Sequence, residues 1–179
     1  MKALKEIGVK KAFKFITFSL FASFVNSIFL FPFRSFLLRI AGADIGKDTV
    51  LHKITFFNHY QQGFGTLKIG NECFVGDEVS LDLSDEIILE DKVTLANRAL
   101  ILTHVNVGYK DHPLQEFFPK ITKKVVIKKG AFVGANATIL PGVIVGQCSF
   151  IGAGAVVTKD VPDWTVVVGS PAKILKHLK

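Results

Sequence analysis

The stretch "IKKGAFVGANATILPGVIVGQCSFIGAGAVVTKDVP", residues 127–162, divides into six hexads, each of which begins with Ile or Val. The second position is Gly in three of these hexads, and the fifth is Ala, Ser or Val in all of them. An α-helix would repeat apolar residues at intervals of three and four, and an exposed antiparallel strand would alternate them. A strict period of six is instead typical of a parallel β-helix, in which each hexad forms one short face and a corner.

The same pattern continues upstream. It begins at Ile69 and Val75, and after a two-residue slip it resumes at Leu89, Leu95 and Ile101. Three hexads make one triangular coil, so stacked coils bury a continuous aliphatic core. We expect the first residue of each hexad to point inward, and the second-position Gly to lie where a side chain would be crowded or φ unusual. A Val/Ile-rich sandwich would need turn signals every eight to twelve residues or so, and these are absent.

Composition and charge limit the alternatives. A chain of 179 residues has room for one substantial domain, and its two cysteines are too few for a disulfide framework. The net charge of +7 favours an anionic partner. Lysines cluster at 1–14, 120–129 and 173–179, but no aromatic–basic RNA-binding signature joins the clusters, so we expect no nucleic-acid partner.

The hexads stop after Asn106 and return at Ile127, so residues 107–126 leave the scaffold. This segment contains prolines and aromatic residues, which favours an ordered flap over a disordered linker. His104 is the last scaffold side chain before the flap. A histidine can act as a general base at neutral pH, but it can equally cap the end of a coil, and the residues alone favour neither reading.

From "RIAGADIG" to "VVVGSPAKILK", roughly residues 40–179, the chain resembles the hexapeptide-repeat acyltransferases. Within that superfamily it is similar to the galactoside and maltose acetyltransferases and to the sugar O-acetyltransferases of polysaccharide biosynthesis. The resemblance implies a left-handed parallel β-helix, acetyl-CoA as co-substrate, and a homotrimer with three interfacial active sites. It implies no metal. The zinc carbonic anhydrases of the same fold need three converging histidines, and His104 and His112 do not reproduce their close pair.

The resemblance also implies roles for individual residues. The "LTH" at 102–104 matches a form of the catalytic histidine stretch, which makes His104 the general base, although the galactoside and maltose enzymes place theirs where this chain has Asn106. His112 in the flap is the second candidate for that role. Asp82, which by itself reads as a turn residue, would contact the acceptor sugar. Asn97 and Arg98 flank the place of an asparagine that commonly binds the acceptor.

On the donor side, the resemblance places CoA along the C-terminal coils. Ala135 and Ala153 would contact the pantetheine arm through their backbones, and Thr158 and Lys159 would follow. Lys173 and Lys176 would attract the phosphates, without the bidentate geometry of the arginines that often occupy these positions. Alternatively, the two alanines only fill the core, and Lys159 is only a solvated surface residue.

The front of the chain carries nineteen consecutive uncharged residues, 15–33. This run is long enough to span a bilayer, but Ser19, Ser23, Asn26 and Ser27 fall on one arc of a helix. Together with the lysines before it, the run also fits a helix in the membrane interface or one packed on the trimer. We expect residues 1–40 to associate peripherally with the cytoplasmic face of the cell membrane, near a lipid-linked or polymer-bound glycan.

These observations predict three regions: an apolar and basic helical segment at 1–40, a β-helix at 41–168, and a basic tail at 169–179. The leading hypothesis is an acetyl-CoA-dependent sugar O-acetyltransferase of cell-surface polysaccharide or glycolipid biosynthesis. The alternatives are N-acetylation of an amino sugar and a non-catalytic, membrane-associated trimeric scaffold.

Overall fold

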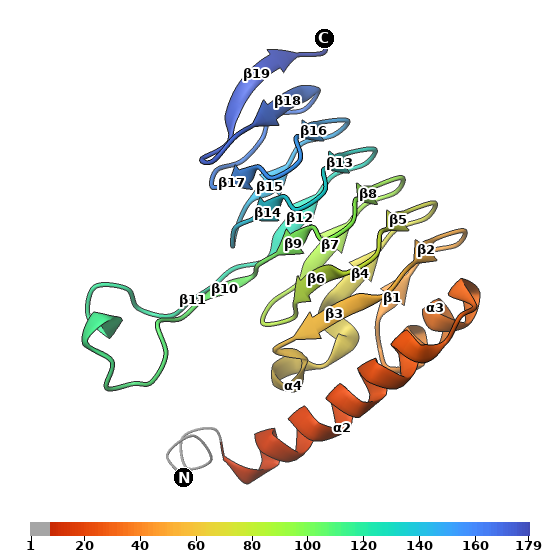
Figure 1. Ribbon diagram of the computed structural model, residues 1–179, viewed down its shortest axis with the longest axis vertical. Coiled ribbons are helices and arrows are strands. Elements are labelled where there is room, and N and C mark those ends of the chain that lie inside the picture. Colours follow the sequence, from red (N-terminus) through yellow and green to blue (C-terminus); the bar gives the residue numbers. More distant parts are fainter. Residues whose placement is uncertain (1–7) are drawn as a thin grey trace.

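The computed structural model describes residues 8–179 and folds most of them into a parallel β-solenoid with three faces (Figure 1). The first face contains β1 (Asp44–Ile45), β4 (Leu67–Ile69), β7 (Ile87–Leu89), β12 (Val125–Ile127) and β15 (Ile144–Val145). The second face contains β2 (Val50–Leu51), β5 (Phe74–Val75), β8 (Thr94–Leu95), β13 (Phe132–Val133), β16 (Phe150–Ile151), β18 (Thr165–Val168) and β19 (Lys173–His177). The third face contains β3 (Ile54–Phe57), β6 (Val79–Asp82), β9 (Leu100–Ile101), β14 (Thr138–Ile139) and β17 (Val156–Val157). Neighbours in each face follow sequence order, so each coil lies directly on the one before it.

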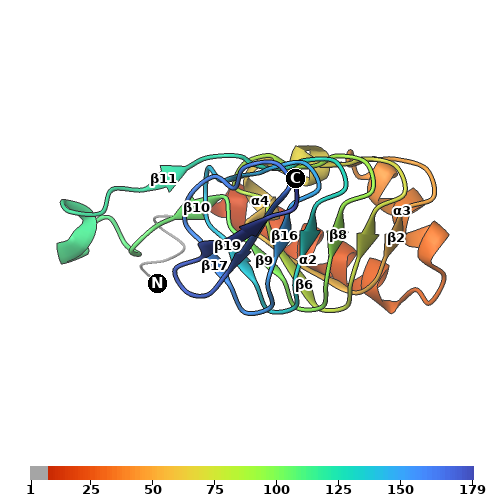
Figure 2. The ribbon, with the colours of Figure 1, turned by 90° about the horizontal axis from the view of Figure 1, so that it is seen from above.

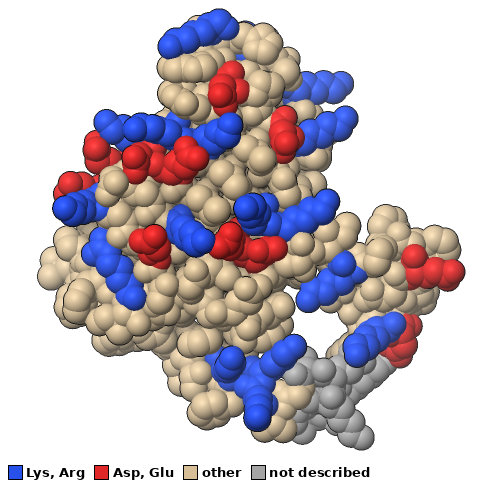
Figure 3. Space-filling view, turned by 180° about the vertical axis from the view of Figure 1, so that it is seen from behind, with Lys and Arg blue, Asp and Glu red and all other residues tan. Residues whose placement is uncertain are grey.

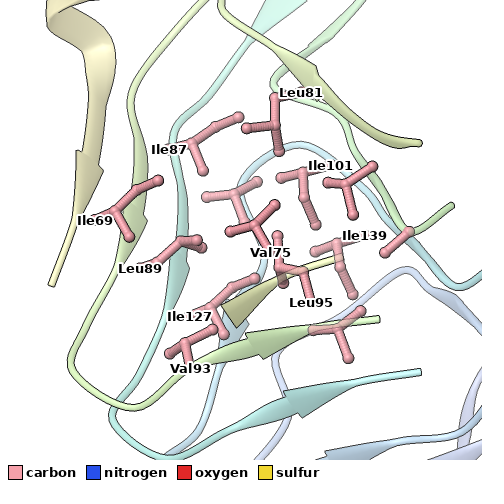
Figure 4. Packing of buried hydrophobic residues seen from close by; sticks show 14 of the residues in the cluster. Ile69, Val75, Leu81, Ile87, Leu89, Val93, Leu95, Ile101, Ile127 and Ile139 are labelled. Atoms are coloured by element: carbon pink, nitrogen blue, oxygen red, sulfur yellow. The ribbon is translucent and has the colours of Figure 1, made fainter. Parts of the chain in front are cut away.

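The strand register aligns the first residues of the hexads into columns. On the first face, Ile69 pairs with Leu89, Leu89 with Ile127, and Ile127 with Val145. Such side chains point inward and meet those of the other faces on the axis of the solenoid (Figure 4). Each of these four residues is at most 3% exposed. Burying one aliphatic side chain contributes about 1.5–3 kcal/mol, so these columns stabilise the stack of coils. The register of the strands confirms the predicted β-helix of hexads.

The corners between faces depend on two hexad positions with different constraints. The fourth residue adopts a left-handed backbone even where it is not Gly, as at Glu72 (φ 55°), Arg98 (φ 61°) and Asn136 (φ 56°). The second-position Gly does not; instead, a Cβ on Gly134 would lie 2.6 Å from the backbone nitrogen of Ala153 in the next coil. Crowding therefore selects Gly at the second position, and the unusual φ occurs two residues later.

Replacing Gly134 with alanine should lower the free energy of unfolding by about 1–3 kcal/mol, because the added methyl group pushes two coils apart. The matched control is Gly65→Ala, whose new Cβ would meet its nearest neighbour at an ordinary 3.6 Å. Urea denaturation measures both. Equal unfolding midpoints for the two variants would contradict the crowding argument.

Two helices, α2 (Val9–Ser27) and α3 (Phe31–Ile40), cover the N-terminal end of the solenoid (Figure 1). The uncharged run at 15–33 is divided between them and does not form one continuous helix. Across residues 8–179, no helix combines the length and the apolar character needed to cross a membrane. Residues 1–7, which include part of the basic start, lie outside the described residues.

Polar side chains of these helices bind the backbone of the first coil, strand by strand. Asn26 donates to the carbonyl of Ile54 in β3 (2.8 Å) and accepts from its N–H (3.1 Å). Arg34 donates to the carbonyl of Leu51 in β2 (3.2 Å), and Arg39 donates to the last carbonyl of β1 (2.7 Å). The helices therefore satisfy backbone groups that would otherwise form the open edge of the stack.

The outer side of the two helices is apolar. Of the predicted polar arc, Ser19 and Asn26 hydrogen-bond to the solenoid side and are partly buried, whereas Ser23 and Ser27 are exposed. Exposed apolar side chains of α2, α3 and the turn between them are Val9, Phe13, Phe15, Ile16, Leu20, Phe24, Phe29, Leu30, Phe33, Phe36 and Ile40. We call this set the apolar base. Such a large exposed apolar surface is typical of an interaction site.

A short insertion between β3 and β4 packs under α2 and consists of α4 (His59–Gln62) and η1 (Phe64–Thr66). His59 is 2% exposed, and its ring centroid lies 6.2 Å from that of Phe15, 6.0 Å from Phe18 and 5.9 Å from Phe64. Burial lowers the pKa of His59 from its ordinary value, since a charged ring would lose its hydration. His59 is therefore a packing residue.

Because the folded-state pKa of His59 is depressed, its contribution to stability is fully present above the unfolded value of 6.5 and is lost as pH falls below it. His59→Phe keeps an aromatic ring at this position and removes the titration. We expect the unfolding free energy of wild type to fall relative to this variant between pH 7.5 and 5.5. A difference that stays constant over this range, measured by urea denaturation, would refute the expectation.

One long excursion leaves the solenoid on a single side (Figure 2). Its elements are β10 (His104–Val105), η2 (Pro113–Gln115) and β11 (Ile121–Thr122), with β10 and β11 paired antiparallel. The Gln115 amide donates to Asn106 Oδ1 (3.0 Å) and to the carbonyls of Gly108 (3.2 Å) and Tyr109 (3.3 Å). The extended loop predicted at about 107–126 is confirmed, and internal hydrogen bonds hold its chain together. We call it the flap.

The C-terminal residues differ from the expected tail. Residues 169–179 contain β19, which pairs antiparallel with β18 on the second face. The ammonium of Lys179 lies 3.4 Å from the ring centroid of Trp164. The segment is therefore an edge strand of the solenoid.

Candidate active site

The chain passes from one coil to the next at the corner that follows each third-face strand, which we call the closing corner. Three polar residues stand there on successive coils: Asn58 after β3, Asp82 at the end of β6, and His104 after β9. Parallel pairing of β3 with β6 and of β6 with β9 stacks these positions. The solenoid therefore brings together side chains that are far apart in the sequence.

Asp82 lies at the centre of this group and is completely buried. Its Oδ2 accepts from the backbone N–H groups of Thr103 (3.0 Å) and His104 (2.9 Å) and from His104 Nδ1 (2.5 Å). Its Oδ1 accepts from Asn58 Nδ2 (2.8 Å) and from Ser84 N (3.2 Å) and Oγ (2.9 Å). Burial raises the pKa of Asp82, but the hydrogen bonds from His104, Asn58 and Thr103 outweigh it, so the net pKa lies below its ordinary value. Asp82 is therefore a carboxylate at neutral pH.

This carboxylate orients His104. With Nδ1–H directed at Asp82, the neutral ring presents the lone pair of Nε2, and no hydrogen bond within residues 8–179 engages that nitrogen. The His104 side chain is 22% exposed, so the ring is partly open to a small reactant. A carboxylate at Nδ1 also stabilises the imidazolium that forms when Nε2 takes a proton. The pair can therefore act as an oriented general base.

The structure gives Asp82 a different setting from the acceptor contact that the resemblance implied. Both of its oxygens are engaged by the chain, and none of its surface is exposed, which favours a positioning role. Sequence reasoning missed Asn58, whose Nδ2 donates to Asp82 Oδ1 (2.8 Å). Nδ2 also lies 3.5 Å from His104 Nδ1, but because that nitrogen directs its proton at Asp82, Asn58 supports the carboxylate and not the ring. One feature of the sequence could have pointed to Asn58: it begins an insertion between β3 and β4, and this insertion leaves the solenoid at the closing corner, as the flap does.

The other predicted acceptor residues do not converge with His104 within one chain. Asn97 and Arg98 lie at the corner between β8 and β9, at the opposite end of β9 from the closing corner. Asn97 Oδ1 accepts a backbone N–H of the preceding coil (3.0 Å). His112 is exposed in the flap, where its Nδ1 accepts a backbone N–H of η2 (3.1 Å).

The predicted donor residues lie along the C-terminal coils. Ala135 and Ala153 occupy the same corner on successive coils, and the Ala135 carbonyl accepts from the N–H that follows Ala153 (2.8 Å). Thr158 and Lys159 stand on the closing corner, two coils beyond His104. The two pairs therefore flank opposite edges of the third face, on the C-terminal side of His104.

The two remaining predicted donor residues, Lys173 and Lys176, are exposed on β19. Lys173 pairs with Val168 at the end of β18, next to the corner that holds Ala153, and Lys176 lies farther along the second face. Lys173 is thus nearer to the other donor residues than Lys176 is.

A cavity of about 590 Å³ separates the flap from α4 and the start of α2. It is lined by Lys11, Tyr60, Gln61, Asn106, Gly108, Tyr109, Lys110, Gln115 and Lys120. Asp82 and His104 do not themselves line the cavity, but residues close to the site in the chain do: Tyr60 and Gln61 follow Asn58, and Asn106 follows His104 by two residues. The cavity is therefore a candidate place for a reactant near the candidate base.

Comparison with known proteins shows the family to which the chain belongs. Residues 124–159 match the family described as "Bacterial transferase hexapeptide (six repeats)". The chain is also 31% identical over 151 residues to WcaF of Escherichia coli strain K12, which is named as an acetyltransferase of colanic acid biosynthesis; the match covers 83% of this chain and 76% of WcaF. The chain belongs to the hexapeptide-repeat acyltransferases. It is therefore an enzyme of the acyltransferase class, and the predicted family is confirmed.

Solved structures of hexapeptide-repeat proteins share the fold. A hexapeptide-repeat acetyltransferase from Vibrio cholerae superposes with a TM-score of 0.82 at 24% identity, covering 96% of this chain and 94% of that one. A galactoside acetyltransferase in complex with coenzyme A gives 0.79 at 20% identity, covering 97% and 84%. The left-handed β-helix that the resemblance implied is the fold of this acyltransferase.

Proposed function

We propose that this acyltransferase moves an acetyl group from acetyl-CoA to a sugar hydroxyl, with His104 as the general base. The hydrogen bond between His104 Nδ1 and the buried Asp82 carboxylate is the observation that carries the proposal. A sugar hydroxyl is a poor nucleophile, and an oriented histidine beside a cavity supplies the proton acceptor that it needs.

The reaction balances without an acyl-enzyme. His104 Nε2 takes the hydroxyl proton while the sugar oxygen attacks the thioester carbonyl, and the Asp82 carboxylate stabilises the imidazolium. The tetrahedral intermediate collapses, the C–S bond breaks, and the imidazolium returns the proton to the leaving thiolate of CoA. The products are an acetyl ester and free CoA.

On the donor side, a groove along the third face would hold CoA, between Ala135 and Ala153 at one edge and Thr158 and Lys159 at the other. Their backbone groups would bind the pantetheine arm, and Lys173 and Lys176 would attract the phosphates. The galactoside acetyltransferase structure supports CoA as the donor, since that protein, which has the same fold, is in complex with coenzyme A.

A homotrimer with interfacial sites would complete the acceptor side. Asn97 and Arg98 are separated from His104 by the length of β9, so in one chain they cannot meet the same sugar. A neighbouring copy, packed against the closing corner, would bring its own Asn97 and Arg98 to the site. The molar mass in solution, measured by light scattering, should be three times that of the 19.7 kDa chain.

Release of free thiol from acetyl-CoA in the presence of candidate glycans tests the activity. We expect an acetylated product that loses its acetyl group in mild hydroxylamine, because esters react under these conditions and amides do not. A hydroxylamine-resistant product would instead establish N-acetylation of an amino sugar. No turnover with any sugar would overturn the proposal.

The apolar base supports a peripheral location on the inner face of the cell membrane. Phe13 and Phe24 of this surface are 68% and 58% exposed, and Lys10 and Lys14 lie beside it, as expected for binding to anionic lipid. A lipid-linked or polymer-bound glycan of polysaccharide or glycolipid biosynthesis would then be presented near the flap.

Flotation with anionic vesicles tests this contact. Deleting the helices would also expose the first coil, so point changes are preferable: the pair Phe13→Ser and Phe24→Ser should release the protein from vesicles. Phe117→Ser, a 71% exposed position in the flap, is the control. If the double variant still floats, or changes the oligomeric state instead, the base does not bind membrane.

A further inference from the structure

We propose that the cavity beside His104 is a binding site for a phosphate or diphosphate group carried by the acceptor sugar. The link to acetyl transfer rests on the proposed function, but the anion site stands on its own observations. The acceptor class is then a glycosyl phosphate or glycosyl diphosphate and not a free sugar.

Three lysines from separate parts of the chain line this cavity. Lys11 comes from the first turn of α2, Lys110 from the outgoing arm of the flap, and Lys120 from its returning arm. Lys and Arg side chains lie on both sides of the hollow between the flap and the body (Figure 3). Three exposed lysines around one cavity make its local potential positive, which favours an anionic ligand.

Among the described residues, no acidic side chain of the lining neutralises these lysines. None of the described residues that line the cavity is Asp or Glu, and the two acids near the tip of the flap, Asp111 and Glu116, are not among them. Elsewhere in the protein, exposed lysines do pair with acids, as Lys68 does with Glu86 and Lys92 with Glu72 (3.4 Å). The cavity is therefore a place of concentrated positive charge.

The rest of the lining suits a sugar attached to the anion. The only tyrosines of the chain, Tyr60 and Tyr109, both line the cavity, and aromatic faces commonly pack on sugar rings. Gln61 and Asn106 also line the cavity; Gln61 Nε2 donates to Ser84 Oγ (3.3 Å) and Asn106 Oδ1 accepts from Gln115 Nε2 (3.0 Å), which leaves Gln61 Oε1 and Asn106 Nδ2 for hydroxyl groups of a sugar. A saccharide can therefore extend from the lysines toward Nε2.

Two sources could supply such an acceptor, and both carry the same chemistry. A nucleoside diphosphate sugar would enter from solution. A lipid diphosphate sugar would approach from the apolar base, because Lys11 lies on α2 beside that surface. The experiment therefore needs one arm for each source.

The first measurement is binding of inorganic pyrophosphate to the full chain by calorimetry, with CoA saturating so that the donor site is occupied. We expect Lys11→Gln and Lys120→Gln each to weaken binding roughly tenfold, the loss typical of one charge-assisted contact. Lys92→Gln, which removes an exposed lysine far from the cavity, should leave the affinity unchanged. Absent binding, or equal binding in all variants, overturns the site.

The second measurement is acetyl transfer to a matched pair of acceptors, a sugar with and without its diphosphate. Wild type should prefer the diphosphate form through KM, and the two cavity variants should raise KM for that form roughly tenfold while leaving the free sugar unaffected. Parallel assays with a nucleoside diphosphate sugar and with a polyprenyl diphosphate sugar in vesicles identify the source. If both forms react equally in wild type, the site is not an acceptor site.

The two proposals fail separately. Pyrophosphate binding that depends on Lys11 and Lys120, without acetyl transfer to any acceptor, would leave the anion site standing and reject the transferase mechanism. Acetyl transfer that is indifferent to both lysines would reject the anion site and keep the mechanism.

Discussion

Replacing His104 with alanine should lower kcat for acetyl transfer by roughly 10²–10⁴-fold, the range for loss of a positioned general base. KM for acetyl-CoA should change little, because the predicted donor residues lie farther along the solenoid. Nδ1 of His104 contacts the stable Asp82 carboxylate, so a small loss of stability is expected as well. Steady-state rates and thermal unfolding measured on the same preparation separate the two effects.

His112→Ala is the control for this prediction, because His112 was the second candidate base. It is exposed, and its Nδ1 accepts a backbone N–H within the flap. Its replacement should leave kcat within about twofold of wild type, as expected of a surface change. A large loss in His112→Ala together with normal turnover in His104→Ala would reverse the assignment.

Asp82→Asn should reduce kcat by roughly 10²–10⁴-fold, because the uncharged amide no longer stabilises the imidazolium and can donate to Nδ1, which moves the ring proton to Nε2. Both oxygens of Asp82 accept hydrogen bonds, from Asn58 and Ser84 on one side and from the N–H groups of Thr103 and His104 on the other. The NH₂ group of the asparagine would replace one of these oxygens and face donors that it cannot bind. A loss of about 1.5–3 kcal/mol in the free energy of unfolding should accompany the kinetic effect.

The dependence of the unfolding free energy on pH in the acidic range tests the ionisation of Asp82. Because the folded-state pKa of Asp82 is below the unfolded value of 3.8, its contribution is fully present above that pH and is lost as pH falls through the folded value. The stability gap between wild type and Asp82→Asn should therefore narrow below about pH 4. A gap that is constant from pH 6 to pH 3 would show that Asp82 does not have the depressed pKa.

The sequence predicted the solenoid well because its signal is local and repeated. Each hexad carries its own inward residue, and columns such as Ile69, Leu89 and Ile127 follow from the period alone. From the sequence we expect either crowding or an unusual φ at the second-position Gly. Crowding is the reason, as at Gly134, and the left-handed backbone occurs at the fourth residue of the hexad, as at Asn136. A single sequence cannot separate these two reasons for a tight corner.

The site was harder to predict because its contacts cross coils. His104 and Asp82 are both candidates from the sequence, but their pairing depends on the register of β6 with β9, which a two-residue slip in the hexads obscures. Asn58 was missed because it lies outside the repeat, after "ITFF". The polar arc on the helix placed Asn26 correctly among polar positions, but the sequence could not show that its amide binds the backbone of β3.

The hydrogen bonds from Asn26, Arg34 and Arg39 to the first coil have a consequence for assembly. A solenoid with bare ends can add a second molecule end to end, strand upon strand, and grow into a fibre. Here the amide and guanidinium groups occupy backbone acceptors of each first-coil strand, and the helices behind them block the approach of another coil. Polymerisation is thus suppressed at this end by three side chains, and variants that lose them should form filaments before they lose their coils.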